Sequence, residues 1–365
     1  MFLYSVISLW ILILCAFGIK IIPSDNKIFN LLDAIGMKSI RPKHRLLNGL
    51  CFFTFLLLWF LTAFRSENIG NDTKIYIEYF DIFSQGIDLD RIFEIGYQYL
   101  NYFLGKLTSS HHAFLICIAT IMYGGVIHYV FKYSKNIPIS LCLFFCYFFS
   151  MFTQIFRQGI AMVIVLYGYQ KLKNGKKAEA AILFALAMAF HSTAIVCFLL
   201  FFDWKILKKQ WFVLMLTAIS VLLAGTGILP KIVGAVVPKY LHYFESRYAS
   251  TGWLAVTYTL VIYIIWYLLI SASLQDNEEA RIISLNFTLM LIFAAFGFCV
   301  NLFTRAGEYF LLIAVVEIPN VLCKSKKKGY KIWLFSLCTI LVGMFILTLA
   351  IRPGWNHLYP YEFWK

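Results

Sequence analysis

Long apolar segments recur along almost the whole chain, and they restrict the fold more than any other feature. Many of these segments hold about 15 to 22 residues, the length of an α-helix that crosses the hydrocarbon core of a bilayer. Hydrophobic residues make up 61% of the 365 positions and charged residues only 14%, which excludes a soluble globular protein. The sequence therefore predicts an all-α, polytopic integral membrane protein that forms a single transmembrane domain over residues 1–365.

The distribution of Lys and Arg predicts the orientation of the helices. Basic residues cluster in short loops between apolar segments, as they do in the cytoplasmic loops of membrane proteins. After the first apolar segment they extend from Lys20 to Arg45, which predicts that the N-terminus lies outside and this loop inside. Because topology accounts for the net charge of +14, we expect no nucleic-acid partner.

This orientation requires about twelve membrane crossings, with both termini outside. The apolar run 137–170 has basic residues at both ends, so it must cross twice and turn near Gln154–Arg157. The run 178–203 also lies between two basic loops, but each half holds only about 12 residues, or about 18 Å of helix. We therefore expect 178–203 to form a short bent or re-entrant helix pair, with His191-Ser192-Thr193 at its tip just below the outer surface.

Two longer segments are predicted on the outer face, namely 65–111 and a loop at 230–253. The first is rich in acidic residues and poor in basic ones, as expected outside. Its apolar residues recur at helical spacing in two sets, which are Ile75, Tyr79, Ile82 and Phe83, then Tyr97, Leu100, Leu104 and Leu107. We expect two short amphipathic helices that lie on the membrane surface.

Ionisable residues within or beside the apolar segments are the candidates for function. Charged groups at membrane depth are energetically costly, so they more often mark a site than a packed core. Those predicted at the outer face or just beneath it are Arg65, Asp72, Glu94, Arg157, His191, Arg247 and Arg305. Guanidinium groups bind phosphate through parallel hydrogen bonds, so this set indicates an anionic ligand such as a lipid diphosphate.

Structural roles are an alternative for several of these residues. Arg65 follows a predicted span, where a long basic side chain commonly extends to the interface. Asp72 and Glu94 precede predicted helices, where a carboxylate caps backbone N–H groups or interacts with the helix dipole. Arg305 and Glu308 are predicted at an outer turn, where they can pair with each other.

Five short motifs follow one another along nearly the whole chain. They are Arg65-x4-Gly70-x-Asp72 followed by Tyr76, Glu94-x-Gly96-Tyr97, Arg157-Gln158-Gly159-Ile160-Ala161, Phe190-His191-Ser192, and Asn301-x3-Arg305 followed by Tyr309-Phe310. The series resembles the pattern of EpsG-like membrane proteins, which look like Wzy-type polymerases of O-antigen (lipopolysaccharide), capsule or exopolysaccharide. The resemblance implies a protein of the bacterial inner (plasma) membrane whose active site faces the periplasm or outside.

The reaction that this resemblance implies is glycosyl transfer between lipid-linked sugars. A growing glycan moves from one undecaprenyl diphosphate to an undecaprenyl-diphosphate-linked repeat unit, with membrane lipid and a chain-length regulator as further partners. Asp72, Glu94 and His191 are candidates for the general base that accepts the proton of the acceptor hydroxyl, and the sequence does not rank them. The expected contacts to diphosphate or glycan are Arg65, Arg157, Gln158, Arg247, Arg305, Tyr97 and Tyr309.

We expect neither a metal ion nor another cofactor. Diphosphate is a good leaving group whose charge Arg side chains can neutralise, and no paired carboxylates lie beside the Arg residues in the sequence. Two other functions use similar groups. A lipid-linked oligosaccharide flippase or transporter needs a pathway to both sides, and an O-antigen ligase differs only in its acceptor. The sequence does not identify the sugars or the linkage.

Overall fold

The computed structural model of the chain is all-helical in the residues that it describes. These residues are 1–21, 42–87, 93–202, 205–226, 253–274, 277–298, 301–324, 329–352 and 357–364, with the isolated positions 228, 231, 235 and 354. Within them, extended pairing is limited to an isolated bridge between Arg65 and Phe363. The predicted all-α class is confirmed.

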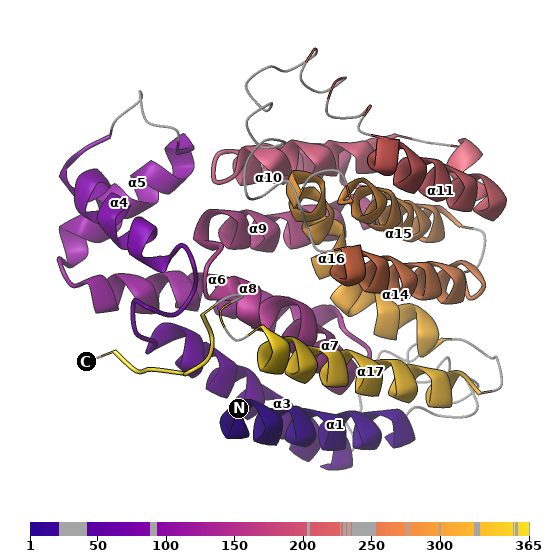
Figure 1. Cartoon of the computed structure of the whole chain (residues 1–365), viewed down its shortest axis with the longest axis horizontal. Coiled ribbons are helices and arrows are strands. Elements are labelled where there is room, and N and C mark those ends of the chain that lie inside the picture. The colour runs from indigo at the N-terminus through magenta and orange to yellow at the C-terminus, as the bar shows by residue number, and fades with distance from the viewer. Residues whose placement is uncertain are drawn as a thin grey trace. The chain divides into compact units, whose positions relative to one another are not determined.

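Five helices in the described part of the chain are long and apolar enough to cross a membrane (Figure 1). They are α1 (Phe2–Ile21), α3 (Pro42–Ala63), α6 (His111–Tyr133), α15 (Glu278–Phe296) and α17 (Tyr330–Ile351). Shorter apolar helices cover residues 137–152, 192–201, 210–223 and 257–271. The protein is therefore a multi-pass membrane protein, whereas the total of about twelve crossings stays a prediction.

The described part of the chain contains further helices. They are α4 (Thr73–Gln85), α5 (Ile95–Leu107), α7 (Ile137–Phe144), α8 (Ser150–Phe152), α9 (Phe156–Lys173), α10 (Lys177–Met188), α11 (Gln210–Thr226), α14 (Trp253–Ser271) and α16 (Asn301–Leu322). A π-helix, η1 (Phe145–Phe149), joins α7 to α8, and the 3-10 helices η2 (Ser192–Phe201) and η3 (Lys205–Lys208) follow α10. The turn predicted within 137–170 is confirmed between α8 and α9.

The prediction that Arg305 and Glu308 lie at an outer turn is wrong. Helix α15 ends at Phe296, where the backbone N–H of Gly297 donates to the carbonyl oxygen of Phe293. Helix α16 begins at Asn301, so Arg305 and Glu308 lie inside its first two turns. Arg and Glu both have favourable helix propensities, and this charged pair therefore interrupts the apolar run without ending the helix.

The described helices form two compact units. The first contains residues 1–164, 186–192 and 322–365, and the second contains residues 165–185 and 193–321. The candidate site described below lies within the first unit. The predicted loop at 230–253 falls almost entirely outside the described residues.

Hydrogen bonds identify the two ends of the helices in the first unit. At one end, the Tyr4 hydroxyl donates to the carbonyl oxygen of Leu358 at 2.8 Å. The backbone N–H of Ser66 donates to the carbonyl oxygen of Glu362, also at 2.8 Å. This end holds both termini (Figure 1). At the other end, Nδ2 of Asn136 donates to the carbonyl oxygen of Gly18 at 3.0 Å. The helices therefore alternate in direction as the basic loops predict.

Helices α4 and α5 occupy the end of the first unit that holds the termini (Figure 1). Stacked aromatic rings attach α4 to its neighbours. The ring centroids of Tyr76 and Phe156 of α9 lie 4.4 Å apart, and those of Phe80 and Phe114 of α6 lie 4.5 Å apart. The Tyr76 ring also meets Tyr97 of α5 edge-on at 5.7 Å. Because aromatic pairs contribute both buried area and a preferred geometry, these contacts fix the helix pair on the spans. The two helices are confirmed, and their position on the membrane surface stays a prediction.

Candidate functional site

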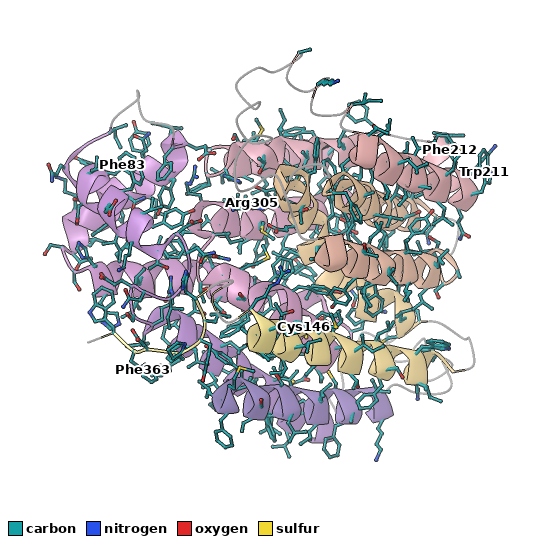
Figure 2. The ribbon with its side chains drawn as sticks, viewed as in Figure 1. Phe83, Cys146, Trp211, Phe212, Arg305 and Phe363 are labelled. Atoms are coloured by element: carbon teal, nitrogen blue, oxygen red, sulfur yellow. The ribbon has the colours of Figure 1, made fainter. Side chains whose placement is uncertain are left out.

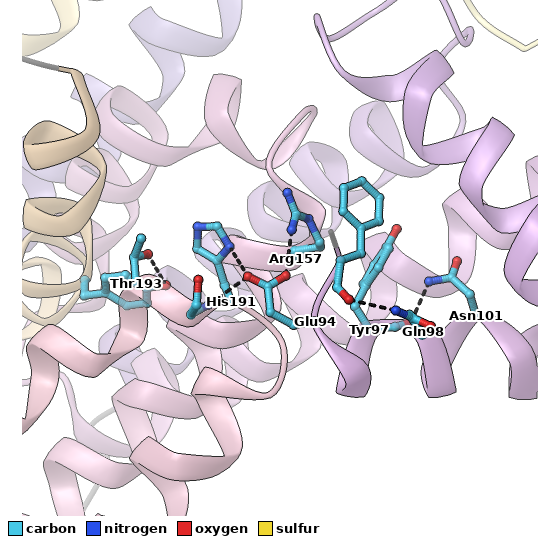
Figure 3. Close-up of polar contacts among 10 residues, drawn as sticks. Glu94, Tyr97, Gln98, Asn101, Arg157, His191 and Thr193 are labelled. Atoms are coloured by element: carbon cyan, nitrogen blue, oxygen red, sulfur yellow. Dashed lines mark hydrogen bonds and ion pairs between the residues drawn. The ribbon is translucent and has the colours of Figure 1, made fainter. Parts of the chain in front are cut away.

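The candidate site lies where α5 begins, beside the break that follows α10 (Figure 3). Glu94 immediately precedes α5, and its side chain does not cap that helix. Instead, Nη1 of Arg157 donates to Oε2 of Glu94 at 2.6 Å, and the backbone N–H of Ser192 donates to Oε1 at 2.8 Å. Nδ1 of His191 lies 3.4 Å from the same Oε1. One carboxylate thus joins Arg157 to the His191-Ser192 segment.

Arg157 is positioned by the start of α9, one residue after the helix begins at Phe156. Its side chain is 19% exposed, and its Cζ lies 3.9 Å from the centroid of the Phe93 ring. A cation over an aromatic face is attracted by the ring quadrupole. The guanidinium is therefore held on one face by Phe93 and at one edge by Glu94, while part of it remains accessible.

His191 and Ser192 follow a break in the helix. Helix α10 ends at Met188, and the backbone N–H of His191 donates to the carbonyl oxygen of Ala187 at 2.9 Å. The carbonyl oxygen of Ala189 instead accepts a hydrogen bond from the backbone N–H of Gly96, at 2.7 Å. The predicted break is confirmed, and it brings His191 to Glu94. The re-entrant crossing itself stays a prediction.

Gly96 allows α5 to approach this break. A Cβ atom at position 96 would lie 2.6 Å from the carbonyl oxygen of Ala189, which is closer than real contacts permit. The hydrogen bond between these two backbones therefore requires a residue without a side chain at this position. This requirement explains the glycine two residues after Glu94.

The contacts of Glu94 keep its carboxylate ionised. Burial acts to raise the pKa of Glu94, but the His191 hydrogen bond, the Arg157 charge and the Ser192 N–H together lower it from the usual 4.5 to about 2. An ionised carboxylate only accepts hydrogen bonds, so it favours the tautomer of His191 that carries its proton on Nδ1. In that tautomer Nε2 is the basic nitrogen, which is suited to accept a proton from a ligand.

Arg65 lies in the same unit but makes contacts of another kind. Its side chain is 1% exposed. Nη2 donates to the carbonyl oxygen of Thr153 at 2.8 Å, and Nη1 donates to that of Thr62. These bonds join the end of α3 to the turn that precedes α9. The burial and the backbone partners favour the structural alternative for Arg65 over a contact with diphosphate.

Asp72 follows a turn that packs against the same Thr153. Gly70 has a φ of +86°, and a Cβ atom there would lie 2.4 Å from the carbonyl oxygen of Thr153, so both conformation and space favour glycine. Asp72 precedes α4, but its side chain makes no capping hydrogen bond to that helix. The capping alternative is therefore not supported, and a catalytic role for Asp72 stays a prediction.

The remaining predicted contacts divide between the two units. In the first unit, Tyr97 and Gln158 are buried, at 0% and 2% exposure. In the second unit, the hydroxyl groups of Tyr309 and Thr193 lie 3.2 Å apart. Arg305 lies in α16 (Figure 2), one turn before Tyr309 in the sequence. Arg247 lies outside the described residues. Ligand contacts by these residues stay predictions.

Two members of the site were absent from the set predicted as functional. Phe93 covers Arg157 with its ring, and Ser192 contributes a backbone N–H. The signal for Phe93 was its position directly before Glu94 in an acidic outer segment. A backbone donor such as that of Ser192 has no signature in the sequence, because every residue except proline carries one.

The second unit contains a buried ion pair that was not predicted from the sequence. Nζ of Lys173 lies 2.6 Å from Oε1 of Glu317 and 3.1 Å from Oε1 of Glu279. The side chain of Glu317 is 2% exposed and that of Lys173 is 7% exposed. The signal for this cluster was Glu317, an acidic residue inside a predicted span. The pair joins α9 to α15 and α16.

Possible metal ligands also occur together in the described residues. The Sγ atoms of Cys15, Cys142 and Cys338 all lie within 4.8 Å of one another. The three side chains are fully buried among α1, α7 and α17, and Cys15 donates to the carbonyl oxygen of Pro138 at 3.2 Å. Buried thiols of this kind commonly pack as small apolar groups. Glu94, by contrast, is surrounded by nitrogen donors, which do not suit a cation.

Comparison with known proteins identifies the family. The sequence model of the EpsG family matches residues 48–363. No curated protein and no solved structure matches the chain. The matched range contains Phe93, Glu94, Arg157, His191 and Ser192, together with the motifs that first suggested the resemblance. This protein is thus a member of the EpsG family.

Proposed function

We propose that this protein is a polysaccharide polymerase of the Wzy type. It transfers a growing glycan from undecaprenyl diphosphate to the sugar of an undecaprenyl-diphosphate-linked repeat unit. Membership of the EpsG family supports a role in polysaccharide synthesis. The observation that carries the proposal is the contact of Glu94 with both Arg157 and the His191-Ser192 segment, because it combines a cation with an oriented imidazole in a membrane protein.

The proposed reaction needs both groups. The acceptor hydroxyl attacks the anomeric carbon of the glycan, and the bond from that carbon to the diphosphate oxygen breaks. The acceptor oxygen loses a proton while the departing diphosphate gains negative charge. We assign proton acceptance to Nε2 of His191 and charge stabilisation to Arg157. Glu94 then acts as a positioning residue that orients both.

We place this reaction on the outer, periplasmic face of the bacterial inner membrane. The Glu94 site lies at the end of the first unit that also holds Tyr4 and Ser66, opposite the contact between Asn136 and Gly18. Basic residues lie close to this second contact in the sequence: Lys20 follows Gly18, and Lys132 and Lys135 precede Asn136. By the positive-inside rule, the end with the basic residues faces the cytoplasm and the Glu94 site faces outward.

Glycan-length analysis in a deletion strain tests the proposal. A strain without this protein should carry a single repeat unit on its final acceptor. Complementation with wild-type protein or Glu78→Gln should restore long chains, because Glu78 is exposed on α4, whereas Glu94→Gln should not. Absence of all surface glycan would instead indicate a flippase. Long lipid-linked chains that never reach the acceptor would indicate an O-antigen ligase.

A further inference from the structure

Helix α5 is apolar on two sides, and two members of the predicted apolar set are used for internal packing. Tyr97 and Leu104, which belong to the predicted apolar set, are 0% and 6% exposed. A second row of apolar side chains faces outward, and it consists of Ile95, Tyr99, Phe103 and Leu107, at 38%, 58%, 62% and 68% exposure. Of these, only Leu107 also belongs to the predicted set. Positions four residues apart are neighbours on a helix surface, so these four form a continuous stripe.

The polar residues of α5 have the opposite distribution. Gln98 and Asn101 are 1% and 0% exposed. Each donates a side-chain hydrogen bond to a backbone carbonyl oxygen, Gln98 to Phe93 at 2.8 Å and Asn101 to Tyr97 at 2.7 Å. A helix at a water-exposed surface normally buries its aromatic residues and exposes its amides. In helix α5 two amides are buried while Tyr99 and Phe103 are exposed, which is the pattern expected next to an apolar medium.

The connection to α6 places the end of α5 close to the membrane. Residues 108–110 link Leu107 to His111, where α6 begins. Helix α6 has 23 residues, so at ~1.5 Å per residue it is about 34 Å long, only slightly longer than the ~30 Å hydrocarbon core. The start of α6 therefore lies at the edge of that core. Four extended Cα–Cα steps move Leu107 at most about 14 Å from it.

The side chains beside the stripe also suit the lipid interface. Tyr99 and Tyr102 each have an apolar ring with a polar tip, and Nζ of Lys106 lies 4.8 Å from the centroid of the Tyr102 ring. Tyr and Lys are typical of the interfacial region, where the apolar part contacts acyl chains and the polar tip reaches the headgroups. Lys106 also provides a positive charge for phosphate headgroups.

We propose that the Ile95–Tyr99–Phe103–Leu107 stripe of α5 binds membrane phospholipid at the boundary between headgroups and acyl chains. Because α5 begins directly after Glu94, and Gly96 is bonded to Ala189, this contact sets the depth of the Glu94 site relative to the bilayer. The site is then held at headgroup level, which is where the phosphate groups of any lipid-linked ligand lie. The lipid contact itself is independent of the proposed polymerase activity.

Site-specific photo-crosslinking in the full-length protein tests this proposal. The photoreactive residue p-benzoyl-phenylalanine is placed at Tyr99 or Phe103, and the protein is irradiated in vesicles of phosphatidylethanolamine and phosphatidylglycerol. Both positions are exposed, so the replacement does not disturb packing. We expect phospholipid adducts at both positions, seen as mass increases of the intact protein.

A control position shows whether the crosslinking reaction itself works. Phe53 lies in span α3 and is 68% exposed, so it should give a phospholipid adduct as the positive control. The proposal is overturned if Phe53 is labelled while Tyr99 and Phe103 are not, or if irradiation in native membranes attaches these two positions to another protein instead of lipid. Neither result bears on glycan synthesis.

Discussion

Oε1 of Glu94 accepts a hydrogen bond at 2.8 Å from the backbone N–H of Ser192, which lies 98 residues further along the chain. The other oxygen of the same carboxylate accepts from Arg157. Glu94 therefore holds together two segments that approach from different helices, the start of α9 and the break after α10. Loss of its charge should affect the orientation of both segments at once.

The substitution Glu94→Gln should lower the rate of chain extension by more than about tenfold. The amide keeps the shape of the side chain but cannot balance the charge of Arg157, and a hydrogen bond to a charged group contributes about 1.5–3 kcal/mol. The measurement is polymer formation by purified protein supplied with lipid-linked repeat units. Glu78→Gln is the control. A fully active Glu94→Gln protein would show that the carboxylate is dispensable.

The low pKa of Glu94 predicts how its contribution to stability depends on pH. The pKa of about 2 in the folded protein is below the usual 4.5, so the stability from the ionised form is fully present above about pH 4.5 and is lost as the pH falls toward 2. The difference in Tm between wild-type and Glu94→Gln protein in detergent should shrink as the pH falls from 4.5 toward 2. A constant difference down to pH 3 would contradict the assignment.

Gly96→Ala should separate α5 from the break after α10. The added methyl group would lie 2.6 Å from the carbonyl oxygen of Ala189, so the backbone hydrogen bond must lengthen and Glu94 must move. Overpacking of this kind costs about 1–3 kcal/mol. Thermal stability and chain extension should both decrease. Gly86→Ala is the matched control, because nothing lies within 4 Å of a Cβ atom there, and it should behave as wild type.

Substitutions of Arg157 and Arg65 should have different consequences. Arg65→Ala leaves the carbonyl oxygen of buried Thr153 without this donor, so we expect less folded protein in the membrane. Arg157→Ala should leave protein levels near normal and abolish chain extension. Arg157→Lys should restore little activity, since an ammonium group lacks the planar surface that lies on Phe93. Protein level and glycan length, measured together, distinguish the two roles.

Chain extension should continue in excess EDTA. Both oxygens of Glu94 accept hydrogen bonds from nitrogen donors, so they are not arranged to bind a divalent cation, which prefers oxygen ligands. Polymer formation by purified protein, with and without EDTA, is the measurement. Loss of activity in EDTA that Mg²⁺ or Mn²⁺ restores would make Asp72 or Glu94 a metal ligand instead of a base or positioning residue.

Much of the helical architecture could be predicted because it follows from local properties of the sequence. Apolar length identifies the spans, and the charge of the loops requires the chain to return between Lys177 and Lys205, which predicted the break at His191. The error at Arg305 and Glu308 has a local origin too. Charged residues that favour helix formation do not mark a helix end, although they do interrupt an apolar run.

The pairings of the site could not be predicted, because they depend on packing between distant segments. The motifs place Glu94, Arg157 and His191 in order along the chain but do not state that one carboxylate contacts both partners. Similarly, Arg65 resembles Arg157 as a cation at the outer end of a span. The two differ only because the carbonyl groups of Thr62 and Thr153 surround the former, and backbone carbonyl groups carry no sequence signal.

The bridge between Arg65 and Phe363 has a consequence for the biogenesis of the protein. The N–H of Ser66 bonds to the carbonyl oxygen of Glu362, and the carbonyl oxygen of Phe64 accepts from the N–H of Trp364. The ribosome makes residues 362–364 long after residues 64–66. The segment that follows α3 therefore waits for the late residues before its backbone is paired. In the proposed orientation, a prematurely released chain would expose this segment to proteases that act outside the membrane.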